Sequence, residues 1–175
     1  MEGSHEGIID KETWQAVQEE LKRREAFMAE HGLKKYSYKN PFSNKVFCGK
    51  CGRPYARHAW KTRRKAQWQC TNHMHDGKVT CYNRHVFEGT LEEAFVRAFN
   101  SIYKDKRGFE KAKKAQLKNS TALERLRAKQ MLELLKEPPL RCFVPEVAQL
   151  VLGEVTVLGR EEFRFLFLDG TEIHV

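Results

Sequence analysis

Four cysteines between residues 48 and 81 have the types and spacing to bind a metal ion. Cys48 and Cys51 form a C-x2-C pair within "CGKCGRPY", and Cys70 and Cys81 follow after eighteen and ten further residues. Zinc prefers four thiolates in a tetrahedron, and this order of ligands is typical of a zinc ribbon. Gly49 and Gly52 would permit the sharp turn that a short pair needs. The sequence therefore predicts one structural Zn²⁺ ion held by Cys48, Cys51, Cys70 and Cys81.

Other ligand sets stay open because the second pair is wider than the usual C-x2-C knuckle. His73, His75 or His85 could replace one of its cysteines. Iron could occupy the same four-sulfur cage, although iron carriers usually have two matched short pairs. Cys142 lies far downstream and is interpreted as an ordinary, partly buried thiol. A saturated thiolate site has no open position for water, so we expect the metal to be structural and not catalytic.

Positive charge is concentrated around these cysteines. The chain has a formal charge of +9, and residues 41–90 hold 10 Lys/Arg against 2 Asp/Glu. An anionic partner is therefore expected, and regularly placed cations suit the phosphates of a nucleic acid. The alternative is a solvated surface with Tyr55, Trp60 and Trp68 packed inward. The candidate DNA-contacting residues are Arg53, Arg57, His58, Lys61, Arg63, Arg64, Lys65, Lys78 and Arg84, and one or more of the arginines would read guanine edges.

The elements that position these residues begin with a helix and a hairpin. Asp10 can cap a helix from Lys11 to about Glu30, whose apolar residues recur on one face. A break follows at 40–43. Residues 54–60 and 66–69 suit two strands joined by a polar turn at 61–65. The hairpin would carry most of the candidate cations.

The remainder of the chain is predicted to be helical and then to end in strands. Residues 90–93 have the spacing of a capping box before a helix to about residue 103, which we expect to pack on a sheet together with the first helix. Helices at 109–118, at 122–135 and around 145–152 follow, and strands lie at 155–157 and 163–168 with a turn at 169–170. Apolar residues on both faces of 163–168 predict a strand that is covered on both sides. The cations from Lys104 to Lys118 could be solvated helical faces or further phosphate contacts.

These features predict an α+β fold: a zinc β-ribbon with a small antiparallel sheet, flanking helices and a helical insertion. We expect a single domain over residues 1–175, divided into an opening helix at 1–39, the ribbon at 40–89, the insertion at 90–137, and a short helix with a closing hairpin at 138–175. The polar first residues and the lack of a long apolar stretch predict a cytoplasmic protein that is nucleoid-associated when it is bound to DNA.

The order of features resembles the carboxy-terminal part of the large serine recombinases, the phage-integrase and transposon-resolving enzymes. The resemblance is carried by "HEGIIDKETWQAVQEELKRR" at 5–24, "NPFSNKVFCGKCGRPYARH" at 40–58 and "LVLGEVTVLGREEFRFLFLDGTEIHV" at 150–175. It implies a zinc-ribbon domain that binds one arm of a duplex attachment site during DNA integration or excision of a mobile element. It also implies that another domain supplies the serine nucleophile, so that this fragment is not an enzyme, and that an inserted coiled coil contacts other recombinase subunits. The stretch 90–137 occupies the place of that insertion.

Two functions from other classes remain as alternatives. One is a zinc ribbon that binds proteins through its apolar surfaces and the 120–136 helix. The other is an iron–sulfur electron carrier. Partner capture without DNA binding would favour the first, and a colourless preparation containing zinc would exclude the second.

Overall fold

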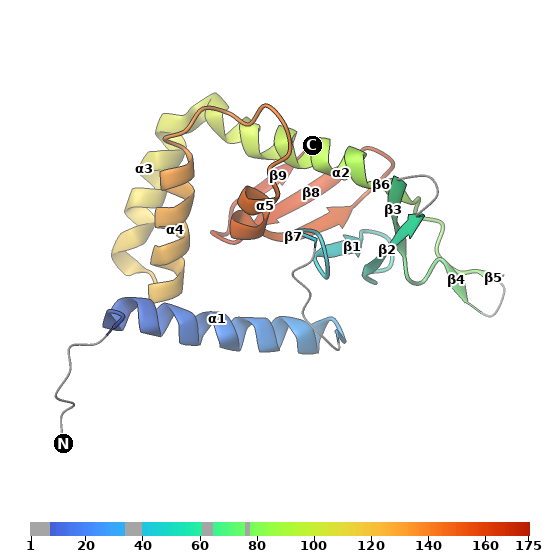
Figure 1. The fold of residues 1–175 in the computed structure, drawn as a ribbon, viewed down its shortest axis with the longest axis horizontal. Coiled ribbons are helices and arrows are strands. Elements are labelled where there is room, and N and C mark those ends of the chain that lie inside the picture. Colours follow the sequence, from blue (N-terminus) through green and yellow to red (C-terminus); the bar gives the residue numbers. More distant parts are fainter. Residues whose placement is uncertain (1–7, 34–39, 61–64, 76–77) are drawn as a thin grey trace, which may run out of the picture.

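The computed structural model describes residues 8–33, 40–60, 65–75 and 78–175. It is an α+β fold, as predicted, and its described residues form five α-helices and three small sheets (Figure 1). The helices of this part of the chain are α1 (Lys11–Glu30), α2 (Glu88–Ser101), α3 (Lys106–Gln116), α4 (Ala122–Leu134) and α5 (Pro145–Val151), with short 3-10 helices η1 (Ile102–Asp105) and η2 (Leu117–Asn119). None of the helices described is long and apolar enough to cross a membrane.

The largest sheet joins two segments that are far apart in the sequence. Its strand order is β1-β7-β8-β9, from β1 (Val46–Cys48), β7 (Leu152–Val157), β8 (Phe163–Phe167) and β9 (Glu172–His174). The pairing of β1 with β7 is parallel, with Val46 opposite Val155, whereas the later pairs are antiparallel. The sequence did not indicate this parallel pair. It makes the strand that bears the first cysteine an edge of the closing sheet.

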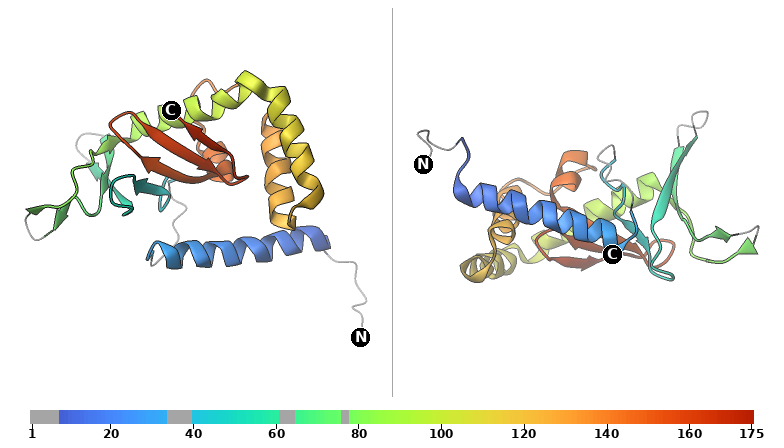
Figure 2. Two further views of the ribbon diagram at one scale, coloured as in Figure 1. Left: turned by 180° about the vertical axis from the view of Figure 1, so that it is seen from behind. Right: turned by 90° about the horizontal axis from the view of Figure 1, so that it is seen from below.

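The second sheet is the ribbon. β2 (Tyr55–Trp60) and β3 (Lys65–Cys70) form the predicted antiparallel hairpin, and β6 (Val86–Phe87) adds to β3. The third sheet is a small hairpin of β4 (Met74–His75) and β5 (Lys78–Val79). Both hairpins project from one end of the molecule, while α3 and α4 form the opposite end (Figures 1 and 2).

The core lies between α2, α5 and the closing sheet. Phe95 on α2 meets Phe165 and Phe167 of β8 with ring centroids 6.2 and 6.1 Å apart, and all three side chains are fully buried or nearly so. Phe42 stacks on Phe143 at 5.3 Å and meets Trp68 of the ribbon edge-on at 6.4 Å. The ribbon and the closing sheet therefore share one apolar core, since residues of both belong to it.

Two expectations about local structure were wrong. Helix α2 begins at Glu88 without a side-chain cap, so the Thr90 capping box does not form; the capping box in the structure is Thr121 with Glu124 at the start of α4. Strand β8 is covered on one face only, because Leu166 on the other face is 37 % exposed. Arg164 lies on that open face and donates to Thr156 at 2.9 Å.

The first helix also packs differently from the prediction. Its bounds and its Asp10 cap are as predicted, but it lies mainly against α4, and only its last turn reaches β1 through Phe27 and Phe47. Trp14, Val17 and Leu21, predicted to form an apolar face, are each 42 to 53 % exposed. Charged groups therefore make much of the contact between α1 and α4.

Glu20 is the centre of that contact. Its carboxylate accepts from Arg23 at 3.0 Å and from Arg24 at 2.6 Å on its own helix, and it pairs with Arg127 of α4. Burial alone would raise the pKa of Glu20, but these hydrogen bonds and the charge of Arg127 outweigh it and lower the pKa to about 2. Nearby, Glu19 accepts from the backbone N–H of Leu123 at 2.8 Å, in the first turn of α4.

We expect Glu20→Gln to loosen α1 by about 1–2 kcal/mol at neutral pH, since the lost charge compensates three arginines. The folded-state pKa lies below the ordinary value of 4.5, so the contribution is complete above pH 4.5 and is lost as the pH falls toward 2. Amide hydrogen exchange across α1 should be faster in the variant than in the unaltered protein, and by the same factor at pH 7 and pH 5.5. Glu25→Gln, an exposed position on the same helix, is the control, and equal effects of the two changes would contradict the prediction.

Candidate metal centre and ribbon surface

The four predicted cysteines meet at one point. Their sulfur atoms all lie within 4.8 Å of one another, with Cys48 and Cys81 at 3.6 Å and Cys51 and Cys70 at 3.4 Å. A tetrahedral ion with metal–sulfur bonds of about 2.3 Å requires sulfur separations of about 3.8 Å. Cys51 is exposed and the other three are buried. The set fits one tetrahedral metal ion without rearrangement of the chain.

The first pair is shaped by two glycines with different roles. Gly52 has φ +70° and donates to the carbonyl of Cys48 at 2.8 Å, which closes the predicted turn. Gly49 is needed for space, because a Cβ there would lie 2.9 Å from the carbonyl oxygen of Val157. Its N–H donates to that same oxygen at 2.9 Å. The cysteine turn is thus held directly against the end of β7.

The wide second pair has a structural explanation. The β4–β5 hairpin leaves after Cys70 and returns just before Cys81, and the N–H of Thr80 donates to the carbonyl of His73 at 3.0 Å across its base. His73 contacts the carbonyl of Cys81 at 2.8 Å through Nδ1 and is not in the sulfur cluster, and His85 packs edge-on against Phe87. The side chain of His75 lies outside the described residues.

The remaining thiol differs from its prediction. Cys142, expected to be partly buried, is exposed and lies outside the cluster. It belongs to the loop between α4 and α5.

One residue of the centre was missed in the sequence. Asn83 is only 2 % exposed, and its Nδ2 donates both to Cys48 Sγ at 3.2 Å and to the carbonyl of Val157 at 2.8 Å. It links the second half of the site to the first cysteine and to β7. The sequence signal that could have indicated this role is an amide side chain two residues after Cys81.

The thiols differ in acidity before metal binds. Burial raises the pKa of Cys48, but hydrogen bonds from Asn83 and from the backbone N–H groups of Cys51 and Lys50 lower it to about 7. Burial raises the pKa of Cys70 and of Cys81 above the ordinary thiol value. Metal binding must displace these protons, so metal affinity falls as the pH falls.

The ribbon presents cations in two environments. Arg53, His58, Lys78 and Arg84 are exposed, and no ion pair between described residues involves them. Arg57 is different, because it makes a bidentate pair with Glu88 of α2, with both distances 2.7 Å. Residues 61–64, including Lys61, Arg63 and Arg64, lie outside the described residues, as does the side chain of Lys65.

Two of the three aromatic residues predicted near these cations face the interior. Tyr55 and Trp68 are 4 and 2 % exposed, and the hydroxyl of Tyr55 donates to the carbonyl of Arg84 at 2.9 Å. They belong to the core and cannot stack on bases. The side chain of Trp60, the third, lies outside the described residues. The Tyr55 contact fixes the backbone that carries Arg84 relative to the hairpin.

A polar groove of about 540 Å³ adjoins the metal centre. Its lining includes Arg84, His85 and Phe87 of the ribbon, and Arg160 and Glu161 of the β7–β8 loop. Tyr82 beside it is 75 % exposed. The groove combines an exposed aromatic ring with two arginines, which suits an anionic ligand with flat groups.

Comparison with known families gives one match. Residues 41–100 match the recombinase zinc beta ribbon domain family. Searches of curated proteins and of solved structures gave no match. The matched span begins just before β1 and ends within α2, and it contains all four cysteines of the cluster. This part of the chain is a recombinase zinc-ribbon domain, as the resemblance implied.

The geometry around Cys48 predicts that Asn83→Ala weakens metal binding by about tenfold to a hundredfold, since a hydrogen bond to a ligand sulfur orients and tunes it. Competition with a chromophoric chelator would measure the affinity at pH 7.5. Asn72→Ala serves as the control, because Asn72 lies in the loop after Cys70 and no hydrogen bond between described residues joins its side chain to a cysteine. Unchanged affinity in the Asn83 variant would contradict this role.

Proposed function

We propose that the chain is the DNA-binding part of a serine site-specific recombinase and that it recognises one arm of a duplex attachment site. The observation that carries this proposal is the set of exposed cations around a four-cysteine cluster within a recombinase zinc-ribbon domain. The serine nucleophile would belong to a separate catalytic domain. Contact with other subunits through the 90–137 insertion stays a prediction.

We also propose that the metal is one structural Zn²⁺ ion. The family match and the four thiolates support zinc, because a closed tetrahedral sulfur site suits an ion without redox chemistry. In this site Cys48 and Cys51 would hold the ion from the turn after β1. Cys70 and Cys81 would hold it from the two sides of the β4–β5 hairpin. The bound ion would cross-link the segments of the ribbon and would take no part in a chemical reaction.

Elemental analysis tests the identity of the ion. We expect a colourless protein with one zinc per chain, and we expect a strong chelator to unfold the ribbon, because the ion would cross-link the end of β1, the end of β3 and the segment after β5. Far-ultraviolet circular dichroism before and after chelation would follow the change. A coloured, iron-containing preparation would exclude zinc, and an unchanged spectrum would exclude the structural role.

The DNA surface proposed here differs from the one expected from sequence alone. Arg57 already neutralises Glu88, so it is a poor candidate for a phosphate contact. Arg53 and Arg84 are better placed, because both are exposed beside the metal turn and the backbone of Arg84 is held by Tyr55. The groove beside Arg84 and Arg160 gives a place where a strand could enter.

A gel-shift assay with the zinc-loaded protein tests the proposal. We expect a shift with duplexes taken from the flanks of its own mobile element. The double change Arg53→Gln and Arg84→Gln should reduce the slope of log affinity against log salt by about 2, because two phosphates would no longer be neutralised. Lys11→Gln with Arg141→Gln removes the same charge from exposed positions outside the ribbon. Absence of any shift, or equal effects of the two double variants, would reject this DNA surface.

A protein-binding module is the second candidate. One observation favours it: Trp14, Val17 and Leu21 on α1 are each at least 42 % exposed. Capture of a protein by the zinc-loaded chain, together with no shift of any duplex, would support this function instead.

A further inference from the structure

The outer face of α3 carries a row of cations. Lys104, Arg107, Lys111, Lys114 and Lys118 follow one another at intervals of three and four residues from η1 to η2. This spacing places Arg107, Lys111, Lys114 and Lys118 on one side of the helix that α3 and η2 form, and Lys104 precedes them on η1, across the cap at Asp105. All five are exposed, and no ion pair between described residues involves them. We call these five residues the α3 stripe.

The other two lysines of this helix, Lys106 and Lys113, have partners within the protein. Lys113 is 8 % exposed and pairs with the buried carboxylate of Asp169 at 2.9 Å. Lys106 donates to the carbonyl of Leu135 and lies 4.0 Å from Glu110. Asp105 accepts from the N–H of Gly108 at 3.0 Å and caps the helix. The acidic groups of this segment therefore have partners on the helix itself, whereas the α3 stripe faces solvent.

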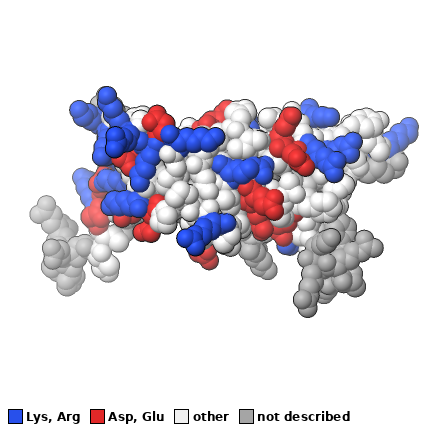
Figure 3. All heavy atoms as spheres, turned by 90° about the horizontal axis from the view of Figure 1, so that it is seen from above, with Lys and Arg blue, Asp and Glu red and all other residues white. Residues whose placement is uncertain are grey.

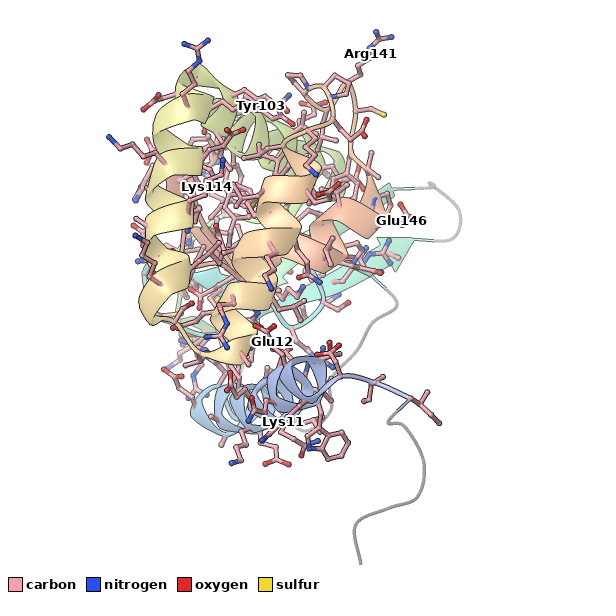
Figure 4. The ribbon with its side chains drawn as sticks, turned by 90° about the vertical axis from the view of Figure 1, so that its left-hand side faces the viewer. Lys11, Glu12, Tyr103, Lys114, Arg141 and Glu146 are labelled. Carbon is pink, nitrogen blue, oxygen red and sulfur yellow. The ribbon has the colours of Figure 1, made fainter. Side chains whose placement is uncertain are left out.

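The position of the stripe makes it a separate surface. Figure 3 shows lysine and arginine side chains gathered, with fewer acidic ones, at the end of the molecule that η1 and α3 form. Lys114 lies on α3 in the view onto this end, beside α4 (Figure 4). The ribbon hairpin projects from the other end (Figure 1). A ligand of the stripe would not share the groove beside the metal centre.

We propose that the α3 stripe binds the phosphate backbone of duplex DNA without regard to sequence. From Arg107 to Lys118 the helix rises about 17 Å, which spans about five phosphates of one strand. Lysines with flexible stems suit point contacts to phosphates and carry no base-specific pattern. An apolar partner helix fits poorly, because the exposed apolar residues between the stripe cations are the small side chains Ala112 and Ala115.

This inference is independent of the proposed function of the ribbon, since it requires no selectivity. The stripe would add affinity for any duplex, and the ribbon would select the site. Because the two surfaces lie at opposite ends, one chain could contact two stretches of DNA. The test therefore measures binding to a duplex of arbitrary sequence, which is present in excess over the protein.

The test variant carries Lys104→Gln, Arg107→Gln, Lys111→Gln and Lys114→Gln. We expect the slope of log affinity against log salt to fall by about 3–4, and affinity near 0.1 M salt to fall tenfold or more, because up to four phosphates would no longer be neutralised. The matched control, Lys11→Gln, Lys22→Gln, Lys136→Gln and Arg141→Gln, removes three lysines and one arginine from exposed positions elsewhere. It should leave the slope nearly unchanged.

Two results would overturn the inference: an unchanged slope in the stripe variant, or an equal fall in the control. Acetylation of lysines in the unaltered, zinc-loaded protein gives a second measurement that does not depend on folding of a variant. DNA should protect Lys111 and Lys114 from the reagent and leave Lys11 and Lys22 reactive, and failure of this protection also rejects the stripe. Failure of the ribbon proposal would give a different result. The protein would then show no preference for the flanking sequence, while the stripe variant would still lower the slope of log affinity against log salt.

Discussion

The tetrahedral sulfur cluster is the constraint on which the arrangement of this protein depends. Cys48 ends an edge strand of the closing sheet, whereas Cys70 ends a strand of the ribbon. A metal ion held by these cysteines would join two sheets that have no strand in common. Asn83 and Gly49 strengthen this connection, since both contact the carbonyl of Val157 at the end of β7. The orientation of the ribbon relative to the core is therefore set by the cysteine cluster and by a few hydrogen bonds around it, together with the aromatic contacts of Phe42.

The elements were largely predictable, because their signals are local. The limits of α1, the β2–β3 hairpin and the turn at 169–170 follow from caps, apolar periodicity and turn residues. The grouping of the four cysteines followed from their spacing alone. The start of α2 was missed because Thr90 had the spacing of a cap, yet the pairing of β6 with β3 and the Arg57–Glu88 ion pair start the helix earlier. Tertiary contacts overrode a local preference there.

The long-range contacts could not be predicted in the same way. The parallel pairing of β1 with β7 joins residues more than one hundred positions apart, and nothing in a three-residue apolar strand specifies its partner. The packing of α1 on α4 was hidden for another reason. Its contact consists of carboxylates that meet arginines and helix N–H groups, whereas the exposed row of Trp14, Val17 and Leu21 has the stronger periodicity. Asn83 was missed because a single amide has no periodic signal.

Charge in the sequence shows where cations are abundant but not which of them have partners. In the ribbon, Arg57 is neutralised by Glu88, while Arg53 is exposed and no ion pair between described residues involves it. In α3, Lys113 reaches a buried carboxylate, while Lys114 next to it belongs to the exposed stripe. The difference in α3 arises from helical geometry, which turns adjacent side chains to different sides. Only the lysines and arginines that face solvent without an acidic partner can bind an anion. The surface available to an anion is therefore smaller than the formal charge of +9 indicates.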